Sequence, residues 1–228
     1  MNNITDDNYL KAIYHLRFTE NEKIVTPTMV ANELLVKPPS VLEKLKGLSH
    51  KKYVKYNKVS GIELTKLGKD IAVNVVRRHR IWETYLNKHL GFSWSEVHEV
   101  AEDLEHVRNE KLIDKIYEIL GNPDFDPHGD PIPNKQGAFP KVERRILSIS
   151  KIGCKLTIVG VTEHSDAFLK YLTDINLSLN DKINVVNIIE FDGSIQIKNK
   201  QHKEIQLSKL IADKIMVRCL KPSCGCKI

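Results

Sequence analysis

Hydrophobic residues in the first quarter of the chain recur every three or four positions, which is the spacing along one face of an α-helix. This spacing predicts helices over residues 4–18 and 26–36, and a third helix after the Pro38-Pro39 turn. Two short runs of apolar and polar residues within 53–64 then predict a two-stranded wing. The order of helix, helix-turn-helix and wing indicates a winged helix-turn-helix domain at residues 1–64.

The middle of the chain is also predicted to be helical. Apolar stripes indicate helices over 65–90, 93–107 and 110–120. The stripe on the second of these helices fits packing against another helix, including one from a second subunit, so we expect a homodimer. Five prolines and three glycines then fall within residues 121–140, a composition that excludes a regular helix or a central strand. We place a helical dimerisation domain at 65–140, with this segment as an ordered linker.

The last part of the chain changes to short runs rich in β-branched residues. These runs predict strands at 155–161, 182–189, 194–198 and 215–219, interrupted by one helix at 166–175. Strands of this number and length predict a small SH3-like barrel at residues 141–228. The expected fold class is therefore mainly α with a C-terminal β module.

Composition and charge narrow the class of protein. No apolar stretch approaches the roughly 18 residues that a membrane span needs, and the first residues lack the pattern of a secretory signal. We therefore expect a cytoplasmic protein with no membrane partner. The formal net charge of +6 favours an anionic partner only weakly. Of the four cysteines, Cys224 and Cys226 fit either a soft-metal site or a tail of reduced thiols.

The positions of the charged residues along the chain are more informative than the net charge. Seven lysines and one acid, Glu43, lie between Lys37 and Lys58, whereas five acids and no lysine or arginine lie between Glu96 and Glu105. The basic segment fits contact with phosphates, and its alternative is a solvated basic face. Because it coincides with the predicted helix-turn-helix and wing, we expect it to bind double-stranded DNA. The expected DNA-binding residues are Lys37, Pro39, Ser40, Glu43, Lys44, Lys55 and Lys58.

The acidic segment contains donors that share one helical face. His98, Glu102, Glu105 and His106 stand at positions i, i+4, i+7 and i+8. Their acids repel one another unless a positive charge lies among them. Carboxylates with imidazoles and no thiolate suit Mn²⁺ or Fe²⁺, with Zn²⁺ not excluded, and the alternative is an acidic solvated face.

A second pair of donors, His79 and Glu83, lies one turn apart on the preceding predicted helix. If the two helices pack antiparallel, this pair can meet His98. Surface ion pairs with the neighbouring arginines explain the pair equally well.

Several motifs together resemble the diphtheria toxin repressor family, which includes iron-dependent repressors and manganese transport regulators. The matching stretches are NYLKAIYHL, PPSVLEKLKGL, LTKLGKDIA, VVRRHRIWETYL, EVHEVAEDLEHV and PHGDPIP. The resemblance extends over essentially the whole chain and implies the three-domain type with a FeoA-type C-terminal barrel. It implies a metal-dependent DNA-binding regulator, acting as a repressor of metal-uptake genes at a palindromic operator when metal is abundant.

The resemblance also implies two metal sites. Glu102, Glu105 and His106 would be ligands beside the first helix, where manganese sensors place acids at the positions of Asn8 and Lys11. Asn8 can still offer a carbonyl oxygen, but Lys11 cannot ligate. The iron sensors have a cysteine at the position of Glu102, so Mn²⁺ is favoured, with Zn²⁺ or Co²⁺ as substitutes in vitro.

The second implied site draws on three parts of the chain, and it has more candidates than one ion needs. The implied ligands are His79, Glu83, His98, Glu163, Asp166, Asp126 and His128.

Two other classes are weighed against this interpretation. A metalloenzyme would also use His/Glu clusters, but the chain has no HExxH motif, no Gly-rich phosphate loop and no Ser-His-Asp order, so we expect no enzyme activity. A winged-helix regulator of an organic ligand would have an apolar pocket in place of the His/Glu cluster.

Overall fold

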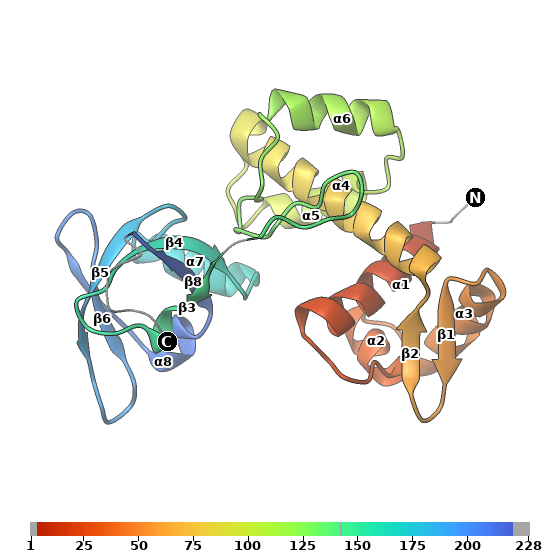
Figure 1. The fold of residues 1–228 in the computed structure, drawn as a ribbon, viewed down its shortest axis with the longest axis horizontal. Coiled ribbons are helices and arrows are strands. Elements are labelled where there is room, and N and C mark those ends of the chain that lie inside the picture. Colours follow the sequence, from red (N-terminus) through yellow and green to blue (C-terminus); the bar gives the residue numbers. More distant parts are fainter. Residues whose placement is uncertain (1–3, 142, 221–228) are drawn as a thin grey trace. The chain divides into compact units, whose positions relative to one another are not determined.

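The computed structural model describes residues 4–141 and 143–220, and these form two compact units (Figure 1). The first unit contains residues 1–82, 101–121 and 132–139, and the second contains 83–100, 122–131 and 140–228, in each case as far as they are described. The division between them passes through two helices, so each of these helices contributes residues to both units. The predicted class, mainly helical with a C-terminal β module, is confirmed.

The first unit begins with the predicted winged helix-turn-helix. Its elements are α1 (Ile4–Tyr14), which continues as a π-helical turn (His15–Thr19), α2 (Pro27–Glu33), α3 (Pro38–His50), β1 (Val54–Asn57) and β2 (Gly61–Leu64). Thr26 caps α2, because its hydroxyl oxygen accepts a hydrogen bond from the backbone N–H of Met29. The apolar residues Val41, Leu45 and Leu48 of α3 are buried in the core of this domain.

Three helices follow the wing. They are α4 (Lys66–Leu90), α5 (Val97–Leu104) and α6 (Glu110–Ile119). The sequence predicted the middle helix over 93–107, and the structure shortens it at both ends. Ser93 is the reason at the first end: its N–H and hydroxyl both donate to the carboxylate of Glu96, which forms a closed turn before the helix starts.

The second unit contains a six-stranded antiparallel sheet in the order β3-β8-β4-β5-β6-β7. The strands are β3 (Arg145–Ile146), β4 (Lys155–Val161), β5 (Lys182–Ile188), β6 (Ile195–Lys198), β7 (Glu204–Leu207) and β8 (Ile215–Cys219). A short 3-10 turn (Leu147–Ile149), α7 (Asp166–Asp174) and α8 (Lys209–Ala212) complete it. Its core is continuous and apolar, and the half-buried Trp94 packs against it from the segment before α5.

Pattern analysis missed β3, β7 and α8. Each is four residues or shorter. The domain boundaries at 64 and 140 stay predictions. Cys224 and Cys226, whose role the sequence left open, lie outside the described residues.

Candidate metal centres and DNA-binding surface

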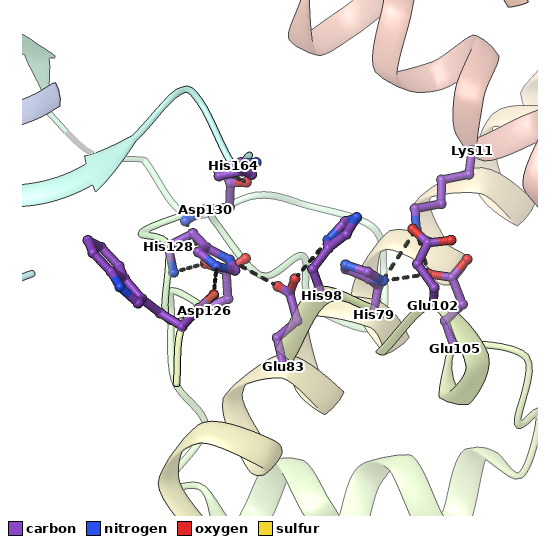
Figure 2. Close-up of polar contacts among 11 residues, drawn as sticks. Lys11, His79, Glu83, His98, Glu102, Glu105, Asp126, His128, Asp130 and His164 are labelled. Carbon is purple, nitrogen blue, oxygen red and sulfur yellow. Dashed lines mark hydrogen bonds and ion pairs between the residues drawn. The ribbon is translucent and has the colours of Figure 1, made fainter. Parts of the chain in front are cut away.

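The first cluster of metal-type donors lies in the first unit and surrounds a lysine (Figure 2). Lys11 of α1 donates hydrogen bonds to Glu102 Oε1 at 2.7 Å and to Glu105 Oε2 at 2.6 Å, and its Nζ lies 3.3 Å from His79 Nδ1. His79 Nδ1 is itself 2.6 Å from Glu105 Oε2. The donor atoms of His79, Glu102 and Glu105 lie within 4.8 Å of one another, which is close enough to share one cation.

Several buried atoms on α1 and just after α5 have no hydrogen-bond partner within the described part of the chain. They are Asn8 Oδ1, Glu105 Oε1 and His106 Nδ1, together with Asp7 Oδ1. α1 and the segment after α5 are close at this point, since Asp7 Oδ2 lies 3.8 Å from His106 Nδ1. Leaving a buried acceptor without a partner costs about 1–3 kcal/mol, so a cation among these atoms would remove a real penalty. The amide, carboxylate and imidazole set fits a hard or borderline divalent ion.

The second cluster lies in the second unit and is built around His128 (Figure 2). His128 Nδ1 is 3.6 Å from Glu83 Oε2, and His98 Nδ1 is 3.3 Å from Glu83 Oε1. Glu83, Asp126 and His128 are all buried and offer donor atoms within 4.8 Å of one another. We name the first cluster, together with Asn8 and His106, the α1 centre. The second cluster is named the linker centre.

The linker holds His128 in place through its own backbone. Asp126 Oδ1 accepts hydrogen bonds from the N–H groups of His128 and Asp130, at 2.8 and 2.9 Å. The carbonyl of His128 accepts from the N–H of Val161 at the end of β4. Gly129 comes next with φ +85°, and a Cβ there would stand 2.1 Å from the carbonyl oxygen of Val159. The prolines of this segment therefore accompany an ordered turn, as the sequence predicted.

The imidazole of His128 is oriented by both of its nitrogens. Nε2 donates to the carbonyl oxygen of Trp94 at 2.6 Å, which directs Nδ1 toward Glu83. A backbone acceptor on one nitrogen is the usual arrangement of a histidine that binds a metal through the other. Burial alone would lower the pKa of His128, but the hydrogen bond and charge of Glu83, aided by Asp126, raise this pKa to about 9.

This raised pKa gives a testable prediction: metal binding at the linker centre displaces a proton. At about pH 7.5 His128 is protonated in the metal-free protein, so each ion bound there should release about one proton. Titration calorimetry in buffers of different ionisation enthalpy measures this number, which should fall toward zero as the pH rises past about 9. The protonated ring also stabilises the metal-free fold below about pH 6.5, and that contribution is lost as the pH rises through about 9. A proton count that does not change with pH would contradict the assignment.

Asp130 and His164 were not predicted as ligands from the sequence, yet both lie near the linker centre. The ring of His164 lies 5.0 Å from that of His128, and its Nε2 is 3.7 Å from Asp130 Oδ2. Burial lowers the pKa of His164, and its buried Nε2 makes no hydrogen bond to the described residues. Asp130 lies in the PHGDPIP stretch and His164 lies next to the predicted ligand Glu163, and only their geometry singles them out.

In this segment the family resemblance implied Glu163 and Asp166 as ligands instead. Glu163 accepts a hydrogen bond from the N–H of Ser165, and Asp166 is exposed in the first turn of α7. Neither belongs to a group of donors close enough to share an ion among the described residues. Their role as ligands stays a prediction that this geometry does not support.

The ion-pair alternative for His79 and Glu83 has less support for two of the adjacent arginines, because both have partners elsewhere. Arg77 donates to the carbonyl of Pro133, and Arg78 pairs with Asp7.

The predicted DNA-binding residues are mostly exposed on α3 and the wing. Those exposed are Lys37, Pro39, Ser40, Glu43, Lys55 and Lys58. Lys44 departs from the expectation that it faces outward. Its Nζ lies 2.7 Å from the buried Asp6 of α1, a carboxylate that Lys51 also contacts at 2.6 Å. Burial would raise the pKa of Asp6, and the two lysines hold it below its ordinary value. Lys44 therefore ties α3 to α1.

Three family models match successive parts of the chain. They describe the N-terminal DNA-binding domain of iron-dependent repressors at residues 4–62, their metal-binding and dimerisation domain at 65–134, and the FeoA domain at 147–219. The diphtheria toxin repressor of Corynebacterium glutamicum is 30% identical over 207 residues, which are 83% of this chain and 89% of that protein. The chain belongs to the iron-dependent repressor family. The resemblance inferred from the sequence motifs is thereby confirmed.

Other members of the iron-dependent repressor family match to different extents. The iron-dependent repressor IdeR of Mycobacterium tuberculosis is 33% identical over 137 residues, and that match spans 58% of each of the two chains. A solved manganese-dependent transcriptional repressor in complex with manganese has a TM-score of 0.81 at 31% identity, over 94% of this chain and 100% of that one. No described helix has the length and apolar character required to span a bilayer.

Proposed function

We propose that this protein is a metal-dependent transcriptional regulator that binds double-stranded DNA when divalent ions occupy the α1 and linker centres. The observation that carries the proposal is the linker centre, in which Glu83, Asp126 and His128 are buried together with His98 at their edge. Buried carboxylates and imidazoles at this spacing are expensive unless a cation is among them. The winged helix-turn-helix of the same chain supplies the surface that would contact DNA.

The proposed ion is Mn²⁺, with Fe²⁺ as its competitor. The proposed donors are carboxylates and imidazoles in both centres, with the amide oxygen of Asn8 in the α1 centre, and none of them is a thiolate, which would favour a softer metal. When bound, the ion supplies positive charge that holds its ligands together and favours the DNA-competent conformation. The proposed ligands are Asn8, Glu105 and His106 in the α1 centre, and Glu83, His98, Asp126 and His128 in the linker centre.

The proposed target is a palindromic operator bound by a homodimer, with repression of metal-uptake genes as the output. A two-fold symmetric protein presents two recognition helices, and the DNA site mirrors that symmetry. On each recognition helix the exposed Ser40 and Glu43 would face base edges, while Lys55 and Lys58 of the wing would contact phosphates.

Binding to DNA should require metal and depend on the wing lysines. Duplexes selected by the protein from a random-sequence library in Mn²⁺ serve as the probe, and fluorescence anisotropy measures affinity with Mn²⁺ and with chelator. We expect chelator to weaken binding by at least about 10-fold, in line with usual allosteric coupling. The double variant Lys55→Ala/Lys58→Ala should reduce the magnitude of the slope of log affinity against log salt by about 4 for a bound dimer, because each of the two lysines in each subunit would neutralise one phosphate.

The control for this experiment is Lys151→Ala/Lys155→Ala, which removes two exposed lysines from the β module and should leave the slope unchanged. Equal affinity in Mn²⁺ and in chelator would rule out the proposed function.

A further inference from the structure

Lys11 occupies the position in the α1 centre where a cation would be expected. Its ammonium donates to two carboxylate oxygens, Glu102 Oε1 and Glu105 Oε2, at 2.7 and 2.6 Å, and His79 Nδ1 lies 3.3 Å away. The same three residues form a group whose geometry could hold a metal ion. A metal ion and the ammonium cannot occupy this position together.

The environment explains why a positive charge is needed there. Glu105 is fully buried and Glu102 is partly exposed, and both carboxylates converge on one atom of a lysine whose side chain is 19% exposed. Two carboxylates at this distance repel each other, and a buried one without a partner is strongly disfavoured. An ammonium is a compact point charge on a flexible stem, so Lys11 can neutralise the pair from α1 without distorting either helix.

We propose that the Lys11 ammonium is a built-in cation that replaces a metal ion at the His79, Glu102 and Glu105 position, so that the α1 centre takes one ion only. That single ion would use the atoms that Lys11 leaves without partners, Asn8 Oδ1, Glu105 Oε1 and His106 Nδ1. Glu105 thereby serves both cations, with Oε2 toward the ammonium and Oε1 toward the metal. This inference rests on the proposed function only in assuming that the α1 centre binds a metal.

The inference assigns Glu102 and His79 a role different from that of metal ligands. In the native protein they position and neutralise Lys11, and they become available to a metal only when the ammonium is removed. The number of ions bound per chain should therefore rise when Lys11 is replaced, whereas the loss of an ordinary structural ion pair would leave that number unchanged or reduce it.

The test counts Mn²⁺ ions per chain by titration calorimetry and by elemental analysis after gel filtration in Mn²⁺. Lys11→Ala should bind one ion more than the unaltered protein, and the double variant Lys11→Ala/Glu102→Gln should lose that additional ion. Mn²⁺ should also raise the Tm of Lys11→Ala by more than it raises that of the unaltered protein, because binding to the folded state stabilises it. Lys11→Met keeps the apolar stem and replaces Lys11→Ala if the alanine variant does not fold.

Lys51→Ala is the matched control. Lys51 also pairs with a buried carboxylate, Asp6 at 2.6 Å, but no group of metal-type donors surrounds it among the described residues. This variant should bind as many ions as the unaltered protein.

Two outcomes would overturn the inference: an unchanged ion count in both Lys11 variants, or the loss of an ion from Glu102→Gln in an otherwise unaltered chain. The second would mean that metal displaces the ammonium in the native protein. The proposed function fails separately, if DNA binding is the same in Mn²⁺ and in chelator, whatever the ion count of the Lys11 variants.

Discussion

Glu83→Gln should weaken Mn²⁺ binding at the linker centre by about 100-fold or more, since loss of even an outer partner of a metal ligand costs 10- to 100-fold. Glu83 is buried and its two oxygens face the two histidines His98 and His128. Glutamine keeps the shape but removes the negative charge. Because Glu83 is also the main group that raises the pKa of His128, proton release on metal binding at about pH 7.5 should largely disappear in the same variant.

The matched control is Glu99→Gln, which removes an exposed carboxylate one residue after His98 and should change neither the affinity nor the proton count. Calorimetry at several pH values measures both quantities. Unchanged Mn²⁺ affinity in Glu83→Gln would mean that the linker centre is not a metal site.

Gly129→Ala should destabilise the second unit by about 3 kcal/mol or more. A left-handed backbone alone costs an L-residue about 1–2 kcal/mol, and here the added Cβ would also stand 2.1 Å from the carbonyl oxygen of Val159, so the turn must move. Since Gly129 directly follows His128, that movement should also weaken metal binding at the linker centre. Urea unfolding measures the first effect and calorimetry the second.

Gly153→Ala separates the two contributions. Gly153 has φ +82° in the same unit, but nothing lies within 4 Å of the position that an added Cβ would take, so only the backbone cost of about 1–2 kcal/mol applies. Equal destabilisation by the two substitutions would show that the linker does not pack on β4 as described.

The helices and the wing were predictable because their apolar residues repeat with a clear period. Val41, Leu45 and Leu48 illustrate this, since the three- and four-residue steps between them require a common buried face. Periodicity could not locate the start of α5, because the turn at Ser93 depends on side-chain hydrogen bonds to Glu96 rather than on the apolar pattern.

The sequence predicted many of the residues in the candidate centres, but it was less able to predict which residues contact one another. Asp126 and His128 were selected from the linker, and the structure places both beside Glu83. Lys44 was expected to face outward, yet it pairs with Asp6 of a different helix. Contacts between residues so far apart in the chain depend on packing, which one sequence does not reveal. The same holds for His164, whose neighbour in the sequence, Glu163, was the more obvious ligand.

The ammonium of Lys11 is part of the chain and is always present at the centre. The occupancy of a metal site depends instead on the concentration of free metal. The salt bridges from Lys11 to Glu102 and Glu105 are therefore as complete in a metal-starved cell as in a metal-rich one. Two exchangeable ions at one centre would make occupancy rise with the square of free metal, but one ion beside a permanent charge makes it rise in simple proportion. On this basis the α1 centre would give a graded response, and any steepness in the response of the regulator would have to come from the linker centre or from the dimer.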